Sequence, residues 1–146
     1  MMNYKPKVYT ASRLGRYQLW ITMAADPEWG FCEFTARWPH LPHVVEGTNT
    51  PVSEDDFATF WSMDIQDIKR SDFVLLYGRE AGLRGALIEC GVALGNGIRV
   101  VTIGLDREHS WSNHPLVTNV ETLIDARNYL FRYTILVPKR RRMEDE

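Results

Sequence analysis

Residues 71–101 read SDFVLLYGREAGLRGALIECGVALGNGIRVV, and this stretch decides the fold class. Phe73–Tyr77 and 98–103 are short, continuously apolar runs, as expected of strands that are buried on both faces. The segment between the two runs is long enough for the crossover helix that two parallel strands require. The stretch therefore predicts a β-α-β unit within an α/β fold, a doubly wound parallel sheet with helices on both faces.

The loop after the first of these strands contains three glycines, Gly78, Gly82 and Gly85. It lies at the carboxyl end of the strand, where open parallel sheets bind their ligands, and glycine allows sharp turns and a close approach to a ligand. Ala86 and Leu87 stand where a phosphate-binding Walker loop needs Lys and Ser or Thr. We therefore expect a ligand crevice here, with Gly82 and Gly85 beside the substrate, but no bound triphosphate.

Length and composition predict one ordinary domain, and the charge balance predicts partners that are small or neutral. The chain has 146 residues, of which 45% are hydrophobic and 25% charged, and its formal net charge is only -2. Such a balance gives no general attraction to nucleic acid or to an anionic membrane. We expect the folded domain to span 1–138, with the segment KRRRMEDE at 139–146 as a charged tail.

The two cysteines, Cys32 and Cys90, lie in apolar contexts and are expected to be buried free thiols. The sequence contains no signal-peptide-like segment and no run of about 18 apolar residues that could span a membrane. These features together predict a cytoplasmic protein.

The remaining elements alternate in type along the chain. Further strands are predicted at 7–11, 31–36 and 133–137. Further helices are predicted at 13–24, from 53 to about 68, and at 119–130, with long loops at 38–51 and 106–115.

The helix that begins at Ser53 carries an acid on its apolar side. Ser53 is the expected N-cap and Asp56 the partner of a capping box. Asp64 then falls beside apolar residues at helical spacing, where an acid needs a polar partner or a functional reason. Asp64 is therefore a candidate site residue.

Glu89 lies near the start of the helix that follows the glycine loop, on a face shared with Ala86 and Ala93. Burial can raise the pKa of a carboxyl by several units, whereas a helix N-terminus typically returns about 0.3–1 kcal/mol, less than one pKa unit. An ionised Glu89 would therefore need a hydrogen-bond donor, and Tyr9, at the end of the neighbouring strand, is the predicted one.

A second interpretation of Glu89 stays open. The residue could face solvent on its helix and form an ion pair with Arg84 or Arg99.

An anion site is predicted directly after the first strand. Ser12, Arg13, Gly15 and Arg16 place a helix start beside two guanidinium groups, a combination that binds phosphate. The alternative is that Ser12 is only an N-cap and that the arginines are solvated.

Three segments together resemble a known family. They are VYTAS at 8–12, DIQDIKRSDFVLL at 64–76 and GALIECGVALGNGIRVV at 85–101. They resemble the nucleoside 2-deoxyribosyltransferases and the related 2'-deoxynucleoside 5'-monophosphate N-glycosidases. The resemblance covers roughly the first dozen residues and about 40 more from Asp64.

The resemblance implies a flavodoxin-like sheet of five parallel strands and an enzyme that needs no metal or redox cofactor. It implies a retaining double displacement in which Glu89 is the nucleophile, Tyr9 orients it and Asp64 contacts the sugar or the base. Leu83 stands where the family usually has a further acid, and Glu80 could replace that acid only if the loop folds back. A non-catalytic nucleotide-binding or sensor protein on the same fold is the alternative.

The resemblance also implies partners. The substrate would be a nucleoside or a nucleotide, and the serine, arginine and glycines after the first strand are similar to those of the monophosphate glycosidases. An asparagine from a neighbouring subunit can complete the family's pocket, so a homo-oligomer is implied, with Asn113 as the candidate.

Two other features are predicted to carry no separate chemistry. His40 and His43 are separated by a proline and lack the cysteine or acid pair that would complete a metal site, so none is expected. The tryptophans are not interleaved with basic residues, which predicts core and pocket wall and not a surface for stacking nucleic-acid bases. These tryptophans include Trp20, Trp29, Trp38 and Trp61.

Overall fold

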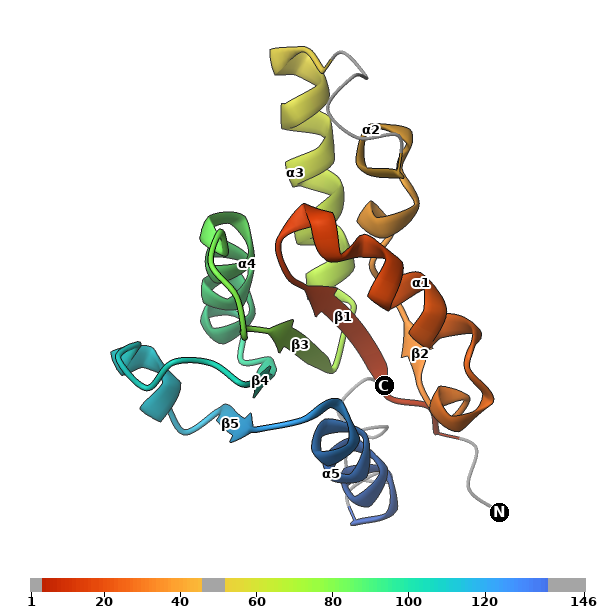
Figure 1. Ribbon diagram of the computed structural model, residues 1–146, viewed down its shortest axis with the longest axis vertical. Coiled ribbons are helices and arrows are strands. Elements are labelled where there is room, and N and C mark those ends of the chain that lie inside the picture. The colour runs from red at the N-terminus through yellow and green to blue at the C-terminus, as the bar shows by residue number, and fades with distance from the viewer. Residues whose placement is uncertain (1–3, 46–51, 137–146) are drawn as a thin grey trace.

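The computed structural model describes residues 4–45 and 52–136 (Figure 1). Its centre is a five-stranded, all-parallel sheet in the order β2-β1-β3-β4-β5. The strands are β1 (Lys7–Ala11), β2 (Glu33–Phe34), β3 (Phe73–Tyr77), β4 (Arg99–Ile103) and β5 (Val117–Val120). This order confirms the predicted α/β class and is the flavodoxin-like arrangement of a doubly wound sheet.

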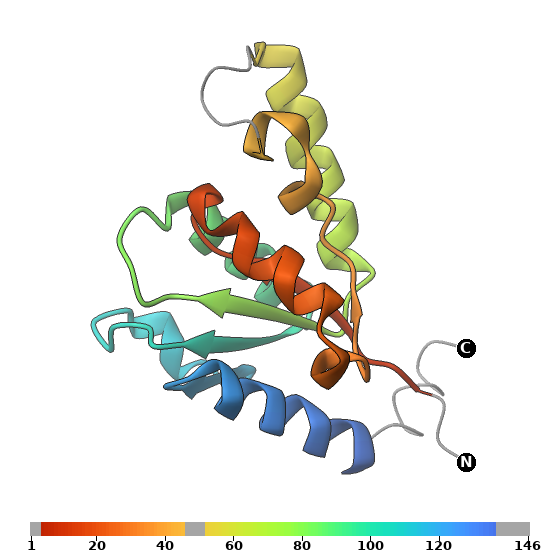
Figure 2. The ribbon, with the colours of Figure 1, turned by 45° about the vertical axis from the view of Figure 1, so that its right-hand side comes forward.

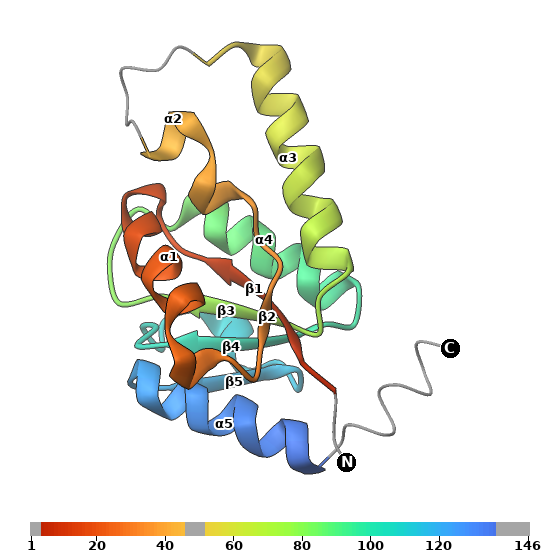
Figure 3. The ribbon, with the colours of Figure 1, turned by 90° about the vertical axis from the view of Figure 1, so that its right-hand side faces the viewer.

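Within the described residues, five α-helices and several short 3-10 turns connect and cover the strands. The helices are α1 (Tyr17–Ala25), α2 (Pro42–Val45), α3 (Glu54–Lys69), α4 (Arg84–Gly95) and α5 (Leu123–Leu136). Figure 3 shows α4 and the lower part of α3 on one side of the sheet and α5 on the other. Figures 1 and 2 show the first turns of α3 extending beyond the sheet together with α2.

The central strands form the core that their apolar sequences predict. Val74, Leu75 and Leu76 of β3 and Val100 and Val101 of β4 are completely buried. Helices cover both sides of these strands, so both faces of each strand can be apolar. The register pairs Tyr9 of β1 with Val74 of β3, which places Tyr9 in an interior strand of the sheet.

Helix α3 begins at the predicted capping box. The backbone N–H of Asp56 donates to Ser53 Oγ at 3.1 Å, and the backbone N–H of Ser53 donates to Asp56 Oδ2 at 3.2 Å. An N-cap of this kind is worth about 1 kcal/mol. The cap therefore fixes where α3 starts and which of its residues face the sheet.

The C-terminal prediction is wrong in one respect. Residues 133–136 belong to α5 and not to a final strand, and residue 137 lies outside the described part of the chain. Ala126, Leu130 and Thr134 are buried at four-residue spacing, and the ring of Tyr133 packs edge-on against Phe73 at 4.8 Å. This continuous helical face extends the helix through the β-branched residues near its end.

The fifth strand is instead Val117–Val120, where a helix was predicted to begin at 119. All four of its residues are half-buried, because β5 is the edge of the sheet, so its sequence lacks an apolar run. The second strand is also shorter than predicted and keeps only Glu33 and Phe34 of 31–36.

Two other predictions fall partly on undescribed residues. The predicted loop at 38–51 contains the 3-10 turn η3 (Trp38–His40) and α2, while 46–51 lie outside the described residues, as does the charged tail at 139–146. Cys32 and Cys90 are buried free thiols, as predicted. Among the described helices, none has the length and apolar character needed to cross a bilayer.

Candidate active site

A cavity of about 370 Å³ lies beyond the carboxyl ends of β1 and β3. The chain leaves β1 toward one edge of the sheet, at β2, and leaves β3 in the opposite direction, toward β4, so this is the topological switch point where such folds bind ligands. Its polar lining residues are Ser12, Arg13, His43, Asp64 and Glu89. Its apolar lining residues are Leu14, Trp38, Phe57, Phe60, Trp61 and Ala86, and Gly82 and Gly85 complete the wall.

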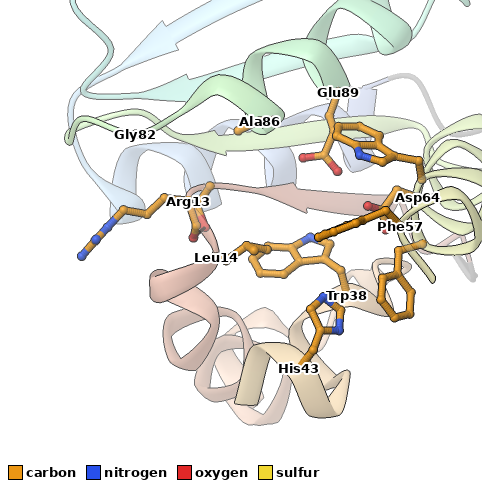
Figure 4. Close-up of a pocket in the computed structure, with 13 residues that line it drawn as sticks. Arg13, Leu14, Trp38, His43, Phe57, Asp64, Gly82, Ala86 and Glu89 are labelled. Atoms are coloured by element: carbon orange, nitrogen blue, oxygen red, sulfur yellow. Dashed lines mark hydrogen bonds between the residues drawn. The ribbon is translucent and has the colours of Figure 1, made fainter. Parts of the chain in front are cut away.

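Glu89 projects from α4 into this cavity (Figure 4). Its neighbours on the buried face of the helix, Ala86, Cys90 and Ala93, are small and let the helix lie close to the sheet. Glu89 is only 6% exposed, while the adjacent Ile88 is 57% exposed. A helix that buries an acid and exposes an isoleucine departs from simple core packing, and such departures concentrate at functional sites.

The hydrogen-bond partner of Glu89 is the predicted one. The hydroxyl of Tyr9 donates to Glu89 Oε2, and Tyr9 is fully buried in β1. This geometry contradicts the alternative in which Glu89 faces solvent beside Arg84 or Arg99. Burial, followed by the charges of the nearby carboxylates, raises the pKa of Tyr9 well above its ordinary range, so the phenol keeps its proton and remains a donor.

Burial also dominates the ionisation of Glu89. It raises the pKa of Glu89 from its ordinary value of 4.5 to about 8, although the hydrogen bond from Tyr9 lowers that pKa and the charge of Asp64 raises it. The donor that the sequence predicts is therefore present, but it only partly offsets desolvation.

Asp64 enters the same cavity from α3. Burial, and then the charge of Asp67, raises the pKa of Asp64 to about 7, while Arg37 lowers it. The Oδ1 atom of Asp64 is buried and has no hydrogen-bond partner among the described residues. The cavity thus holds two carboxyl groups that both titrate near neutral pH, a common property of acid–base sites.

Asp67 was not identified from the sequence, and it anchors the cavity wall. Its fully buried carboxylate accepts from the Arg37 backbone N–H at 3.1 Å, from Arg37 Nη2 at 2.8 Å and from Arg70 Nε at 3.4 Å. These bonds hold the segment that leads into Trp38, whose Nε1 donates to the Thr10 carbonyl at 2.7 Å. The available signal was a second acid three residues after Asp64.

The predicted anion site binds a carboxylate of the protein itself. Arg13 Nε lies 3.1 Å from Glu80 Oε2, and Arg16 approaches both Glu80 oxygens at 2.5 and 3.1 Å. Figure 4 shows the Arg13 side chain extending away from Glu89. The hydrogen bond and charge of Arg16 lower the pKa of Glu80, so Glu80 is ionised and not available as the missing loop acid.

The remaining predicted residues of this region divide between the cavity and its support. Ser12 lines the cavity but is not an N-cap, because its hydroxyl donates to the Arg13 carbonyl and accepts from Trp20 Nε1. Gly15 and Arg16 do not line the cavity. Gly82 does, and its φ of +82° is a left-handed conformation that strongly favours glycine.

Asn113 lies apart from the cavity of its own chain. It belongs to the 3-10 turn η5 (Ser110–Asn113), and its Nδ2 donates to the Ser110 carbonyl at 3.3 Å. Its proposed contribution to a neighbouring subunit stays a prediction.

His43 was considered only as a metal ligand, and the structure places it in the cavity wall. Its ring stacks on Phe60 with a centroid separation of 4.2 Å and an interplanar angle of 11°. His40 is exposed. Within 4–45 and 52–136, no group of three or more His, Cys, Asp or Glu side chains could hold a metal ion.

The tryptophans are distributed as predicted. Trp20 and Trp29 belong to the core, and Trp38 and Trp61 form part of the cavity wall.

No protein-family model matches the chain, and no curated protein matches it. The functional interpretation consequently depends on the chemistry of the cavity.

Proposed function

We propose that the protein cleaves or transfers the N-glycosidic bond of 2'-deoxynucleosides or their 5'-monophosphates, with Glu89 as the nucleophile. The observation that carries the proposal is a buried carboxyl group that faces a cavity and receives a hydrogen bond from Tyr9. A carboxylate so placed can attack an anomeric carbon, as in retaining glycosidases.

The size and walls of the cavity support a nucleoside-sized substrate. Its volume of about 370 Å³ falls within the usual range for small-molecule sites, roughly 300–1,000 Å³. Two tryptophans and two phenylalanines form one part of its wall, which suits a planar base, and its carboxyl groups can contact a sugar. A metal ion is not required for this chemistry.

The reaction takes two displacements. In the first, a Glu89 oxygen bonds to C1' of the deoxyribose while the bond from C1' to the base nitrogen breaks, and the bonding electrons leave with the base. The base nitrogen takes up a proton. In the second, water or another base attacks C1', the ester bond to Glu89 breaks and the carboxylate is restored; a proton leaves the attacking group.

Asp64 is the best candidate for the group that supplies the first proton. Leu83 occupies the position at which the resembled family has an acid, and it is buried. Asp64 faces the cavity, and its pKa of about 7 leaves a substantial protonated fraction at neutral pH.

The proposal is tested by comparing base release by wild type and by Glu89→Gln. Wild type is incubated with a mixture of deoxynucleosides and deoxynucleotides plus acceptor bases, and free and exchanged bases are separated by chromatography. We expect Glu89→Gln to lower turnover at least about a thousandfold, because the amide cannot act as the nucleophile. Glu121→Gln, at an exposed glutamate, is the matched control and should retain wild-type turnover.

The second candidate is a non-catalytic nucleotide-binding protein, and Leu83 in place of an acid is the observation that favours it. In that case nucleotides would raise the melting temperature of wild type, but no base would be released from any substrate in the mixture. Equal base release by wild type and Glu89→Gln would contradict the assignment of Glu89 as the nucleophile.

A further inference from the structure

Three buried side-chain polar atoms lack a hydrogen-bond partner among the described residues, and two of them belong to residues that line the cavity. The three are His43 Nδ1, Asp64 Oδ1 and Ser112 Oγ, and the first two belong to the cavity wall. Each unpaired buried polar atom destabilises the folded protein, because it has given up its hydrogen bonds to water without gaining others. Because both atoms belong to side chains of one cavity wall, a ligand with polar groups that binds in this cavity is the partner that they lack.

The His43 ring is held in place before any ligand binds. Its parallel stacking on Phe60 fixes the ring plane, and the neighbouring Trp38 is fixed by its hydrogen bond to the Thr10 carbonyl. A polar atom on a fixed ring can form a hydrogen bond with little further loss of side-chain entropy. His43 is therefore suited to recognition of one ligand edge.

Its position in the cavity indicates which part of the substrate it meets. Figure 4 shows Glu89 at one side of the cavity and His43 at the opposite side. In a displacement by Glu89, the leaving base departs from the sugar on the side opposite the attacking oxygen. The base then lies toward the aromatic walls and His43, and the deoxyribose lies toward Glu89.

We propose that His43 Nδ1 hydrogen-bonds an edge of the leaving nucleobase and thereby determines which bases the enzyme accepts. This inference depends on the proposed glycosidic activity and adds a recognition residue to it. An imidazole nitrogen donates or accepts according to its tautomer, so a base with the matching group pairs with it and a base without that group leaves it unpaired. Sites built on such a pair discriminate strongly against the unmatched ligand.

Three substitutions distinguish the contribution of the Nδ1 atom from the contribution of ring stacking. His43→Phe keeps an aromatic ring to stack on Phe60 but removes Nδ1. His43→Asn keeps a polar group near the Nδ1 position, and His43→Gln moves the same amide farther along the side chain. The Asn and Gln variants carry the same amide at two different positions. They therefore test the position of the polar group even if the Phe variant does not fold.

The first readout is kcat/KM for deoxyadenosine, deoxyguanosine, deoxyinosine, deoxycytidine and thymidine. We expect His43→Phe and His43→Gln to lower kcat/KM for the preferred base about ten- to hundredfold and to reduce the selectivity among bases. His43→Asn should retain most of both.

The second readout is calorimetric titration with free adenine, guanine, hypoxanthine, cytosine and thymine, which requires no turnover. Wild type and His43→Asn should bind the preferred base more tightly than the other two variants do. Without ligand, His43→Phe should melt at or above the wild-type temperature, because it removes an unpaired polar atom.

The outcomes distinguish the two proposals. If wild type releases no base, the glycosidic activity fails, and the titration still tests His43. If wild type releases base but all three variants keep its selectivity, or lose it equally, the role of His43 is overturned. A wild-type protein that binds none of the five bases also overturns it.

Discussion

Helix α3 carries two acids three residues apart, the half-buried Asp64 and the fully buried Asp67, and their surroundings differ. Asp67 lies at the sheet end of the helix, where its carboxylate accepts hydrogen bonds from Arg37 and Arg70. Asp64 faces the cavity, and its Oδ1 atom has no partner among the described residues. A buried acid that is paired with arginines supports the fold, whereas an acid that faces a cavity without a partner is available for chemistry.

Glu89 resembles Asp64 in that its carboxyl group faces the cavity. Its hydrogen-bond donor is a phenol, and burial raises its pKa to about 8. The comparison therefore separates Asp67, whose removal should cost mainly stability, from Asp64 and Glu89, whose removal should cost mainly activity.

The largest expected effect on stability is that of Asp67→Asn. The substitution removes the buried charge and one of the two acceptor oxygens, so the hydrogen bonds from Arg37 and Arg70 are fewer and no longer pair opposite charges. We expect the free energy of unfolding to fall by about 2–4 kcal/mol, less than for a fully buried pair because both arginines are half-exposed. Urea unfolding measures the effect, with Asp64→Asn as the matched control on the same helix. An equal loss in both variants would remove the distinction between the two acids.

The next effect is that of pH on stability through Glu89. Its pKa is about 8 in the folded protein and ordinarily 4.5, so between these values the unfolded chain has released a proton that the folded protein keeps. The stability from protonated Glu89 is complete below about pH 4.5 and is lost as pH rises through about 8.

Glu89→Gln does not titrate and should therefore be more stable than wild type above pH 8. Each pKa unit corresponds to about 1.4 kcal/mol, so the gain could reach a few kcal/mol at pH 9 and should shrink toward pH 5. Melting curves of both proteins from pH 5 to 9 measure the difference. A gain that does not change with pH would show that Glu89 is not buried in its protonated form.

The pH dependence of catalysis sharpens the role of Asp64. The nucleophile requires Glu89 to be ionised and the leaving base requires Asp64 to be protonated, so kcat/KM should be bell-shaped with a maximum between about pH 7 and 8. Asp64→Asn should lower kcat/KM by about ten- to a thousandfold and remove the alkaline decline. An alkaline decline that survives in Asp64→Asn would assign the proton to another group.

The smallest expected effect concerns the 5'-phosphate. Glu80 forms ion pairs with Arg13 and Arg16, which would otherwise be free to bind an anion. Glu80→Gln should therefore raise kcat/KM for a deoxynucleoside monophosphate relative to its nucleoside by about tenfold. Parallel assays of deoxyinosine and its monophosphate measure this ratio, and an unchanged ratio would show that phosphate does not use these arginines.

The parts of the site that the sequence predicted depend on local patterns. The apolar runs of β3 and β4 identified the β-α-β unit, and the small residues around Glu89 indicated that the acid was buried. Tyr9 could be assigned as its partner because a doubly wound sheet brings the end of β1 beside the start of α4. The first two signals lie in a few neighbouring residues, and the third follows from the sheet topology that they predict.

The parts that were missed depend on contacts between distant residues or on weak patterns. Asp67 binds Arg37, 30 positions away, and nothing near either residue indicates the pair. His43 lies in a four-residue helix that begins at a proline, so no periodicity placed it in the cavity wall. The edge strand β5 has no apolar run, and a polar segment that precedes a helix was assigned to that helix.

The most direct test of the account is to look for the glycosyl-enzyme ester. The protein is mixed briefly with a deoxynucleoside that it cleaves, and the reaction is quenched in acid. The protein is then digested and analysed by mass spectrometry. We expect a deoxyribosyl adduct on the peptide that contains Glu89 and no adduct in Glu89→Gln. An adduct on another residue, or rapid base release by Glu89→Gln, would contradict the assignment of Glu89 as the nucleophile.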